Sequence, residues 1–334
     1  MKKILYILFA FFAMFISSCS NDDIEIKSGI TVKVDPSGVV SPFTYEKKAG
    51  ELTSFPSDYK LRIRCLVYNS QGLLVEQDVQ YLQNYERIST NKMMLEKGIY
   101  TIVAISDVVE YKGSNVSFEY WNMTGSDKLA TTKLTDAGYI GGQYKILGLD
   151  IKNLIVGDDE KNECQLHPQA IGALCLVEWF NIHTYSIVEQ YTLEMSKTND
   201  FVQLNENGDY DFAFDNDNDE FKWRLAYIEP KETDVEQVNN LYNYYYVLPM
   251  KNVKFRFTYK ANGKESVLFN PDNVSLEAQK EYWFALDLCD ADNNNKITRA
   301  CGVLINGSNN AKGNVFTTRT IESKESLFIK DYVH

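Results

Sequence analysis

The chain has 334 residues, and at about 150 residues per domain this length predicts two domains or one large β-rich domain. Hydrophobic residues make up 44% and charged residues 24%, so the chain can build a core and is not disordered as a whole. The formal net charge is −12 and no basic stretch offsets it, which excludes nucleic acid as a partner because its phosphates would be repelled.

The amino terminus is typical of an exported bacterial lipoprotein. Two lysines follow Met1, and residues 4–16 are an uninterrupted run of apolar or small residues. This run fits a signal peptide and is too short for a spanning helix, which needs about 20 residues. Ile16-Ser17-Ser18-Cys19 then has the small residues before a cysteine that form a lipobox. We predict a signal peptide over residues 1–18 and lipid attachment at Cys19; the alternative is an ordinary secretory signal followed by an incidental cysteine.

An acidic stretch, residues 20–23, follows Cys19 within a predicted lipidated linker over residues 19–29. It resembles the export signal that sends lipoproteins of Bacteroides-type bacteria to the outer face of the outer membrane; the alternative is a solvated acidic linker. We therefore expect a lipid-anchored protein that is exposed at the cell surface. No other run approaches about 18 apolar residues, so no spanning helix is predicted in the mature chain.

Apolar and polar residues alternate with a period of two over much of the chain, which predicts strands rather than helices. In the first half this pattern predicts an N-terminal β-sandwich over residues 30–163. Residues 107–150 are rich in Gly and Thr and are predicted to form loops and short segments. The predicted strands are 30–34, 61–68, 73–81 and 99–106.

A polar stretch at residues 157–163 marks the predicted domain boundary, and a second strand series predicts a C-terminal β-sandwich over residues 164–290. Asn262-Gly263 is the sharpest hairpin signal in the chain. The predicted fold class is therefore all-β, with two tandem sandwiches after a lipoprotein signal peptide. The predicted strands of this half are 173–182, 189–196, 243–250, 253–259, 267–269 and 281–288.

Residues 291–334 form a C-terminal extension beyond the second predicted sandwich. Residues 315–321 and 326–333 have strand patterns, and such segments need a sheet edge because they cannot bury an apolar face alone. Either they pair with their own domain as extra strands, or they serve as a donor strand for an adjoining subunit.

The sequence carries no motif of enzymatic chemistry: no HExxH, GxSxG, P-loop or GxGxxG pattern occurs. The chain has only three histidines. His167 precedes Pro168 at a turn and His183 ends a predicted strand, positions that favour a structural role over a catalytic one. We predict a protein that is not an enzyme and has no catalytic residue and no cofactor.

Two other kinds of site are weighed and not favoured. The acidic stretches 215–220 and 290–295 offer oxygen ligands but lack the glycine and closing glutamate of an EF-hand, so no metal site is predicted. Tyr120 and Trp121 would bind a sugar by stacking if they were exposed, although adjacent aromatics more often pack in a core.

The cysteines form neither a disulfide framework nor a zinc ribbon, since an odd number remains after Cys19 and no CxxC pair occurs. Cys65 and Cys175 lie in apolar strand patterns and are predicted to be buried. Cys289 and Cys301 flank a polar loop, and a disulfide between them stays open.

The order of several motifs resembles the fimbrillin superfamily of Bacteroides-type (type V) pili, and most of all its FimB-type branch of fimbrial anchors and minor subunits. Each motif alone is a generic strand–turn–strand pattern, and the resemblance covers residues 1–290. The motifs are the lipobox, LRIRCLVYNSQGLLV (61–75), LEKGIYTIVAISD (95–107), HPQAIGALCLVEWFNI (167–182), YVLP (246–249) and SLEAQKEYWFALDL (275–288).

This resemblance implies two transthyretin-like β-sandwiches and a pilus made by strand exchange. In stalk pilins of the family, a trypsin-like protease cuts after a basic residue and removes the first strand, and a strand of the next subunit fills the vacated groove by β-augmentation. An anchor subunit keeps its lipid and its first strand. In this chain Lys27 is the only basic residue between Cys19 and Ile30, which favours an uncut anchor.

The sequence therefore predicts a surface lipoprotein of the fimbrium, joined to a pilus stalk subunit by strand exchange and held in the outer membrane by lipid at Cys19. One alternative is a stalk or tip pilin of the same system. The other is a glycan-binding outer-membrane lipoprotein of a polysaccharide-uptake system.

Overall fold

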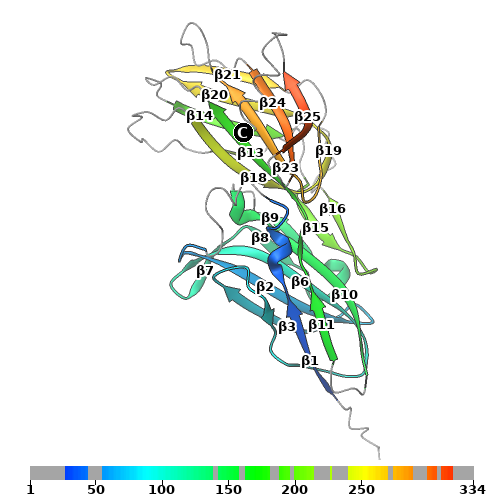
Figure 1. Ribbon diagram of the computed structural model, residues 1–334. Helices are drawn as coiled ribbons and strands as arrows, with labels where there is room; N and C mark the ends of the chain where they lie inside the picture. Colours follow the sequence, from blue (N-terminus) through cyan, green and yellow to red (C-terminus); the bar gives the residue numbers. More distant parts are fainter. Residues whose placement is uncertain are drawn as a thin grey trace, which may run out of the picture.

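In the computed structural model the chain is built from strands, with three short 3-10 helices in the part that is described (Figure 1). The predicted all-β sandwich class is confirmed. Within this part of the chain, no helix has the length and apolar character needed to cross a membrane. The structure describes residues 27–43, 55–137, 142–157, 162–180, 188–195, 199–213, 226–227, 240–269, 274–288, 299–306 and 310–318.

The first half of the chain contributes twelve of the described strands and all three 3-10 helices. They are β1 (Ser28–Val34), η1 (Pro36–Val39), β2 (Tyr59–Asn69), β3 (Leu74–Leu82), β4 (Ile88–Ser89), β5 (Met93–Leu95), β6 (Gly98–Lys112), β7 (Asn115–Glu119), β8 (Trp121–Thr124), η2 (Leu129–Thr131), β9 (Lys133–Asp136), η3 (Gly142–Lys145), β10 (Gly148–Val156), β11 (Asn162–Leu166) and β12 (Gln169–Ala170).

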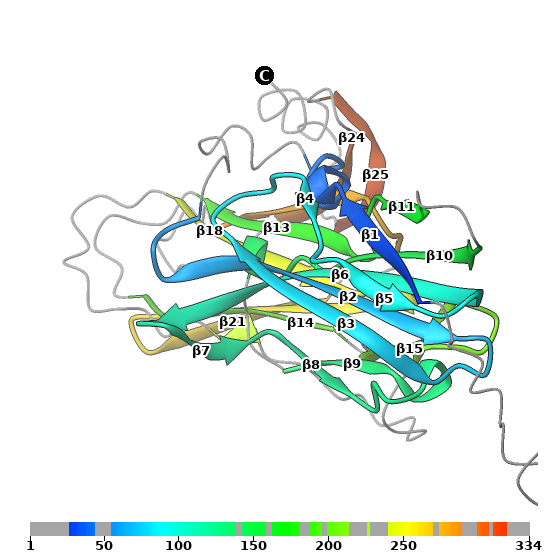
Figure 2. The same cartoon turned by 90° about the horizontal axis from the view of Figure 1, so that it is seen from below.

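These strands form layers on both faces of one long sheet, whose order is β12-β10-β6-β2-β3 with β7 beside β6. On one face lies a small sheet in which β1 pairs with β11, β4 and β5. On the other face lies the sheet β16-β15-β9-β8, in which β15 (Phe201–Leu204) and β16 (Tyr210–Ala213) come from the second half of the chain. Figure 2 shows β1, β5 and β11 on one side of β2 and β6, and β8, β9 and β15 on the other.

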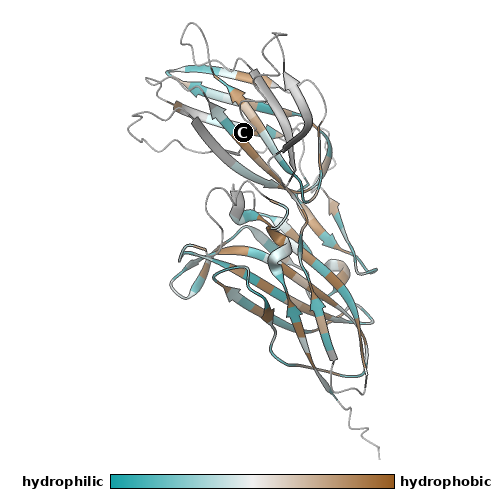
Figure 3. Ribbon diagram, in the orientation of Figure 1, coloured by the Kyte–Doolittle hydropathy of each residue, from teal (hydrophilic) through white to brown (hydrophobic). Residues whose placement is uncertain are grey.

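The central strand β2 is buried on both faces because each face meets a covering layer. Leu61, Ile63 and Cys65 face the core shared with β1, whereas Leu66 and Tyr68 face the core shared with β8, β9 and β15. Apolar and polar residues alternate along the strands in Figure 3. The period of two therefore assigns each side chain to one of two cores.

The second half of the chain contributes thirteen described strands. They are β13 (Ala173–Phe180), β14 (Val188–Met195), β15 (Phe201–Leu204), β16 (Tyr210–Ala213), β17 (Ala226–Tyr227), β18 (Asn240–Val247), β19 (Met250–Val253), β20 (Phe255–Ala261), β21 (Lys264–Phe269), β22 (Val274–Leu276), β23 (Glu281–Asp287), β24 (Arg299–Asn306) and β25 (Asn310–Thr318).

Two sheets of this half enclose a third core. Their orders are β18-β13-β23-β24-β25 and β17-β14-β20-β21, and an aromatic cluster that includes Trp179, Phe257 and Phe284 fills the space between them. Asn262 and Gly263 join β20 to β21 with φ of 52° and 74°, as a type I′ hairpin requires. The predicted Asn-Gly hairpin is thus confirmed.

Strand pairing also connects the two halves. β11, which spans the predicted boundary between residues 163 and 164, runs parallel to β1. β15 and β16 come from the second half but extend the sheet of β8 and β9, through pairs such as Val202 with Leu134. The hairpin at residues 201–213 therefore pairs with a sheet of the first half, although it follows the predicted boundary in the sequence. The division into two domains stays a prediction.

The region from residue 107 to 150 holds more strand than the sequence predicts. β6 continues to Lys112, and β7, β8 and β9 follow in short hairpins. Glycine and threonine favour turns, but β6 is held along its length by β2 and β10, so its strand runs on past the apolar segment that predicted it.

In the C-terminal extension, β24 pairs antiparallel with β23 and β25 with β24, as extra strands of the chain's own sheet. β25 includes the first part of the predicted strand 315–321, while 326–333 lies outside the described residues. The proposed donor strand is therefore limited to the segment after Thr318.

Candidate functional site at the first strand

The first strand, β1, lies between partners on both of its edges. On one side it runs parallel to β11, with Ile30 beside Asn162 and Val34 beside Leu166. On the other side it runs antiparallel to β5 and β4, with Ser28 beside Leu95. Figure 1 shows β1 next to β11 in the lower part of the molecule. Because β1 has neighbours on both sides, its absence would leave a groove with unpaired main-chain groups.

The side chains of β1 help to close the core between the two sheets. Ile30, Val32 and Val34 are almost fully buried, and they alternate with more exposed residues as the period of two predicts. Thr90 fixes the register, since its hydroxyl accepts a hydrogen bond from the N–H of Val32 at 3.0 Å and its own N–H donates to the carbonyl of Val32. Burying three β-branched residues contributes roughly 1.5–3 kcal/mol each.

Polar contacts hold both ends of β1. At its start, Ser28 Oγ donates a hydrogen bond to the carbonyl of Gly157 at 3.1 Å. At its end, Asp35 accepts a hydrogen bond from Ser37, which lowers the pKa of its carboxyl group; burial opposes this shift and Arg87 assists it. The strand is thus fastened beyond its ladder of main-chain bonds.

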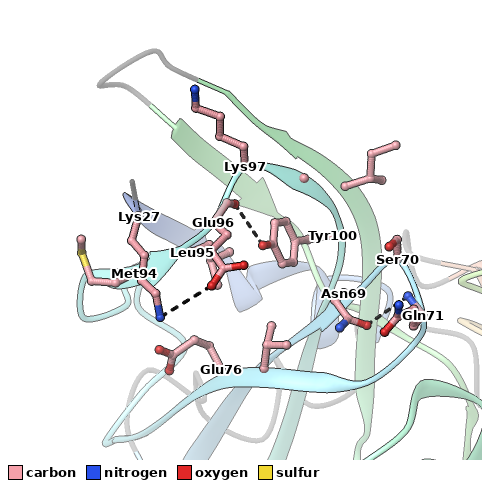
Figure 4. Close-up of a pocket in the computed structure, with 13 residues that line it drawn as sticks. Lys27, Asn69, Ser70, Gln71, Glu76, Met94, Leu95, Glu96, Lys97 and Tyr100 are labelled. Carbon is pink, nitrogen blue, oxygen red and sulfur yellow. Dashed lines mark hydrogen bonds and ion pairs between the residues drawn. The ribbon is translucent and has the colours of Figure 1, made fainter. Parts of the chain in front are cut away.

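The end of the first sandwich where β1 starts contains a pocket of about 450 Å³. Figure 4 shows Lys27, Met94, Glu96 and Tyr100 around it. Lys27 Nζ lies 4.0 Å from a carboxylate oxygen of Glu96, and the Tyr100 hydroxyl donates to the Glu96 carbonyl at 3.0 Å. The pocket therefore lies directly beside the point where the chain joins β1 from the amino-terminal side.

Of the candidate histidines and acidic stretches, the structure describes only His167. Nδ1 of His167 lies 3.9 Å from a carboxylate oxygen of Asp35, at the far end of β1 from Lys27. His183 and the stretches 215–220 and 290–295 lie outside the described residues, as does Cys19. Among the residues that are described, no three His, Cys, Asp or Glu side chains are grouped as metal ligands.

Tyr120 and Trp121 are buried, so an exposed aromatic platform at this pair is wrong. The Trp121 indole donates a hydrogen bond to the carbonyl of Lys145 at 2.7 Å. Both rings pack in the same core, Trp121 against Tyr246 and Tyr120 against Phe118. A sugar would have no access to either face. The alternative that they pack in a core is confirmed.

Cys65 and Cys175 are buried, as predicted, and both are free thiols. Burial raises the pKa of the Cys65 thiol to about 12 and also raises the pKa of Cys175. Cys289 lies outside the described residues, and the structure does not describe the side chain of Cys301, so their disulfide remains open.

A buried ion cluster that the sequence does not reveal lies on the face of β2 opposite Ile63. Arg62 donates two hydrogen bonds to Asp107 in β6, and Arg64 Nη2 lies 3.3 Å from the same carboxylate. Burial lowers the pKa of the Arg64 guanidinium, and Asp107 opposes this shift. Because polar and apolar residues alternate in β2, the sequence predicts that these arginines lie on an exposed face. The one sequence feature that fits their burial is a carboxylate to pair with them, Asp107, which lies 45 positions after Arg62.

A scan against models of protein families finds no match, and neither does a search of curated protein sequences. Solved structures to which the chain is similar include a candidate polysaccharide-binding protein from Bacteroides thetaiotaomicron. Its identity is 14% and its TM-score 0.48, covering 88% of this chain and 99% of that one.

Two further similar structures are fimbrial proteins. One is the fimbrial anchor protein Mfa2 from Porphyromonas gingivalis, at 13% identity and a TM-score of 0.44, covering 87% of this chain and 100% of that one. The other is a fimbrial assembly protein from Parabacteroides distasonis, at 10% identity and a TM-score of 0.41, covering 87% of this chain and 98% of that one. Fimbrial proteins, the class that the sequence motifs resemble, are thus among the structures to which this chain is similar.

Proposed function

We propose that the chain matures to a lipid-anchored protein of the cell surface, attached to the outer membrane at Cys19, and that it serves as the anchor or a minor subunit of a type V pilus. The lipobox and the acidic residues behind it support the attachment. The order of motifs shared with fimbrillins supports the pilus role. The function is one of binding, without an enzymatic step.

One observation favours an anchor over a stalk subunit: β1 stays between β11 and its antiparallel neighbours, and Lys27 precedes it. A trypsin-like cut after Lys27 would leave Ser28–Val34 in the fold. Lys33 lies inside the paired strand, with its Nζ 2.8 Å from Glu163, whereas proteases prefer exposed, unpaired loops. The basic residues before the end of β1 therefore give a protease no easy way to remove it.

The stalk subunit is the partner of this proposal, and strand exchange is the mode of joining. The anchor's own groove is filled by β1, so the anchor must supply a strand to the stalk rather than receive one. The described sheet ends at β25, and residues 319–334 follow it. We assign the donor role to that segment.

The test is the amino terminus of the protein purified from outer membranes, read by intact mass and peptide mapping. We expect an acylated Cys19 followed by an unbroken chain through Val34. An amino terminus at Ser28, Val34 or Lys48 would overturn the anchor role, because the chain would have lost its lipid. The matched control is Lys27→Gln, which abolishes a product that begins at Ser28 if such a product forms.

A further inference from the structure

The end of the first sandwich from which β1 starts carries several large apolar side chains on its surface. Four large apolar side chains are exposed there, and we call them the basal patch: Val75, Met94, Ile99 and Ile155. Ile155 is 73% exposed and Ile99 57%, the highest values among the large apolar residues of the described chain. Exposed apolar groups that gather at one end of a molecule indicate a contact surface.

Strand pairing brings two of these side chains together, and the pocket connects one of them to the other two. Ile99 in β6 lies directly opposite Ile155 in β10, so the two point from the same face of the sheet. Val75, Met94 and Ile99 line the basal pocket. The patch thus spans the start of β3, the middle of β5, the start of β6 and the end of β10.

The layer that covers this face stops short of the isoleucine pair. The turn between β15 and β16 contains Gly208, and a Cβ on that residue would contact Thr101 and Ile151. Ile99 lies two residues before Thr101 in β6, and Ile155 lies two residues after Asn153 in β10. Both isoleucines are therefore beyond that turn. Within the described chain, the face is covered as far as Thr101 and is open beyond it.

The proposed lipid anchor is tethered beside this patch. Ser28 bonds to Gly157, two residues after Ile155, and Lys27 pairs with Glu96, three residues before Ile99. Ser28 follows Cys19 by nine positions, and even a fully extended chain of this length spans only about 30 Å. A lipid at Cys19 therefore keeps this end of the sandwich close to the membrane surface.

From these observations we infer that the basal patch contacts the membrane itself and sinks its apolar side chains into the interfacial region of the bilayer. This inference rests on the proposed lipidation of Cys19. The contact would set the orientation of the protein on the membrane. Figure 1 shows the first sandwich and the sheet that ends in β25 at opposite ends of the molecule, so the first would lie against the membrane and the second away from it.

The charges around the patch suggest a zwitterionic or neutral lipid surface rather than a strongly anionic one. Lys27 and Lys97 line the pocket, but so do Glu76 and Glu96. The basic and acidic groups balance, so electrostatic attraction to anionic lipid is not the driving force. Burial of apolar side chains is therefore the main source of the membrane-binding free energy. We expect Ile99 and Ile155 to contribute more to it than contacts with charged headgroups.

The test uses the mature lipidated protein in phosphatidylcholine vesicles whose acyl chains carry bromine, which quenches tryptophan at short range. The Ile155→Trp variant should lose more emission in brominated than in plain vesicles, relative to the parent chain. The matched control is Val267→Trp, another exposed strand position, in β21 of the second half of the chain. That variant should lose no more emission than the parent.

Three results would overturn the inference. Equal quenching of the two variants while the protein remains lipidated would reject membrane contact and leave the anchor function standing. A mature chain without lipid would reject both. Light scattering in detergent tests for a third result. If the parent protein were a dimer and the Ile99→Ser, Ile155→Ser double variant a monomer, the patch would bind a second copy of the chain.

Discussion

The hydroxyl of Tyr246 in β18 donates a hydrogen bond to the carbonyl of Leu147 at 2.9 Å, across 99 positions of the chain. The same oxygen accepts a bond from the N–H of Gly172 at 2.6 Å. Tyr246 is completely enclosed, and burial raises the pKa of its hydroxyl. One phenol thus fastens the second half of the chain to the end of the first.

We expect Tyr246→Phe to destabilise the protein by about 1–3 kcal/mol, because the buried N–H of Gly172 loses its acceptor. The carbonyl of Leu147 keeps a second bond from Ile171, so most of the effect comes from Gly172. Urea unfolding followed by fluorescence measures the change. Tyr259→Phe is the matched control: among the described residues its buried hydroxyl has no hydrogen-bond partner, so that variant should be neutral or more stable.

Asp107→Asn should lower stability by about 3–5 kcal/mol, since two buried arginines would lose their only fully buried carboxylate neighbour among the described residues. Thermal unfolding is the measurement. Arg64→Met separates charge from packing: Nε and Nη2 of Arg64 make no hydrogen bond within the described part of the chain, so this variant should be neutral or stabilised. An equal loss in Arg64→Met would contradict this expectation and show that Arg64 contributes to stability despite its missing hydrogen bonds.

Cys19→Ser should abolish acylation, because the thiol is the group that carries the lipid. The variant is expected in the soluble fraction or as an unprocessed precursor, and it should not take up a palmitate analogue. Cys65→Ser is the control, since that cysteine is buried in β2 and cannot be acylated in the folded chain. Labelling of the Cys19→Ser variant in the outer membrane would contradict the lipobox.

The buried cysteines predict a pH dependence. Burial raises the pKa of Cys65 from its ordinary value to about 12, so the folded state favours the neutral thiol. The resulting stabilisation is complete below the pKa of the unfolded thiol, about 9, and is lost as pH rises toward 12. At pH 8, iodoacetamide should leave Cys65, Cys164 and Cys175 unmodified in the native protein and label them after unfolding; rapid native labelling would contradict their burial.

Truncation after Thr318 should leave a folded, lipidated, surface-exposed protein that no longer retains pili. This position keeps β25 whole, whereas a cut after Asn314 would pass through the strand and damage the sheet. Surface pili are counted by electron microscopy, and folding is checked by circular dichroism. Normal retention of pili by the truncated protein would place the coupling to the stalk elsewhere.

The amino-acid sequence by itself determined the class of fold and much of the strand content. The period of two in residues 61–68 marks a strand whatever surrounds it, because successive side chains point to opposite faces. Asn262-Gly263 closes its hairpin because both residues accept positive φ. The burial of Cys65 and Cys175 follows from the same local patterns.

Only the tertiary structure decided which strands are neighbours. Alternation shows which residues face a core, but it does not show that β1 pairs with β11 some 130 positions later or that β15 joins β9. It also does not show that a second layer covers Arg62 and leaves Ile155 uncovered. These outcomes depend on where each layer ends over its sheet, a property of the packed molecule that no local pattern encodes.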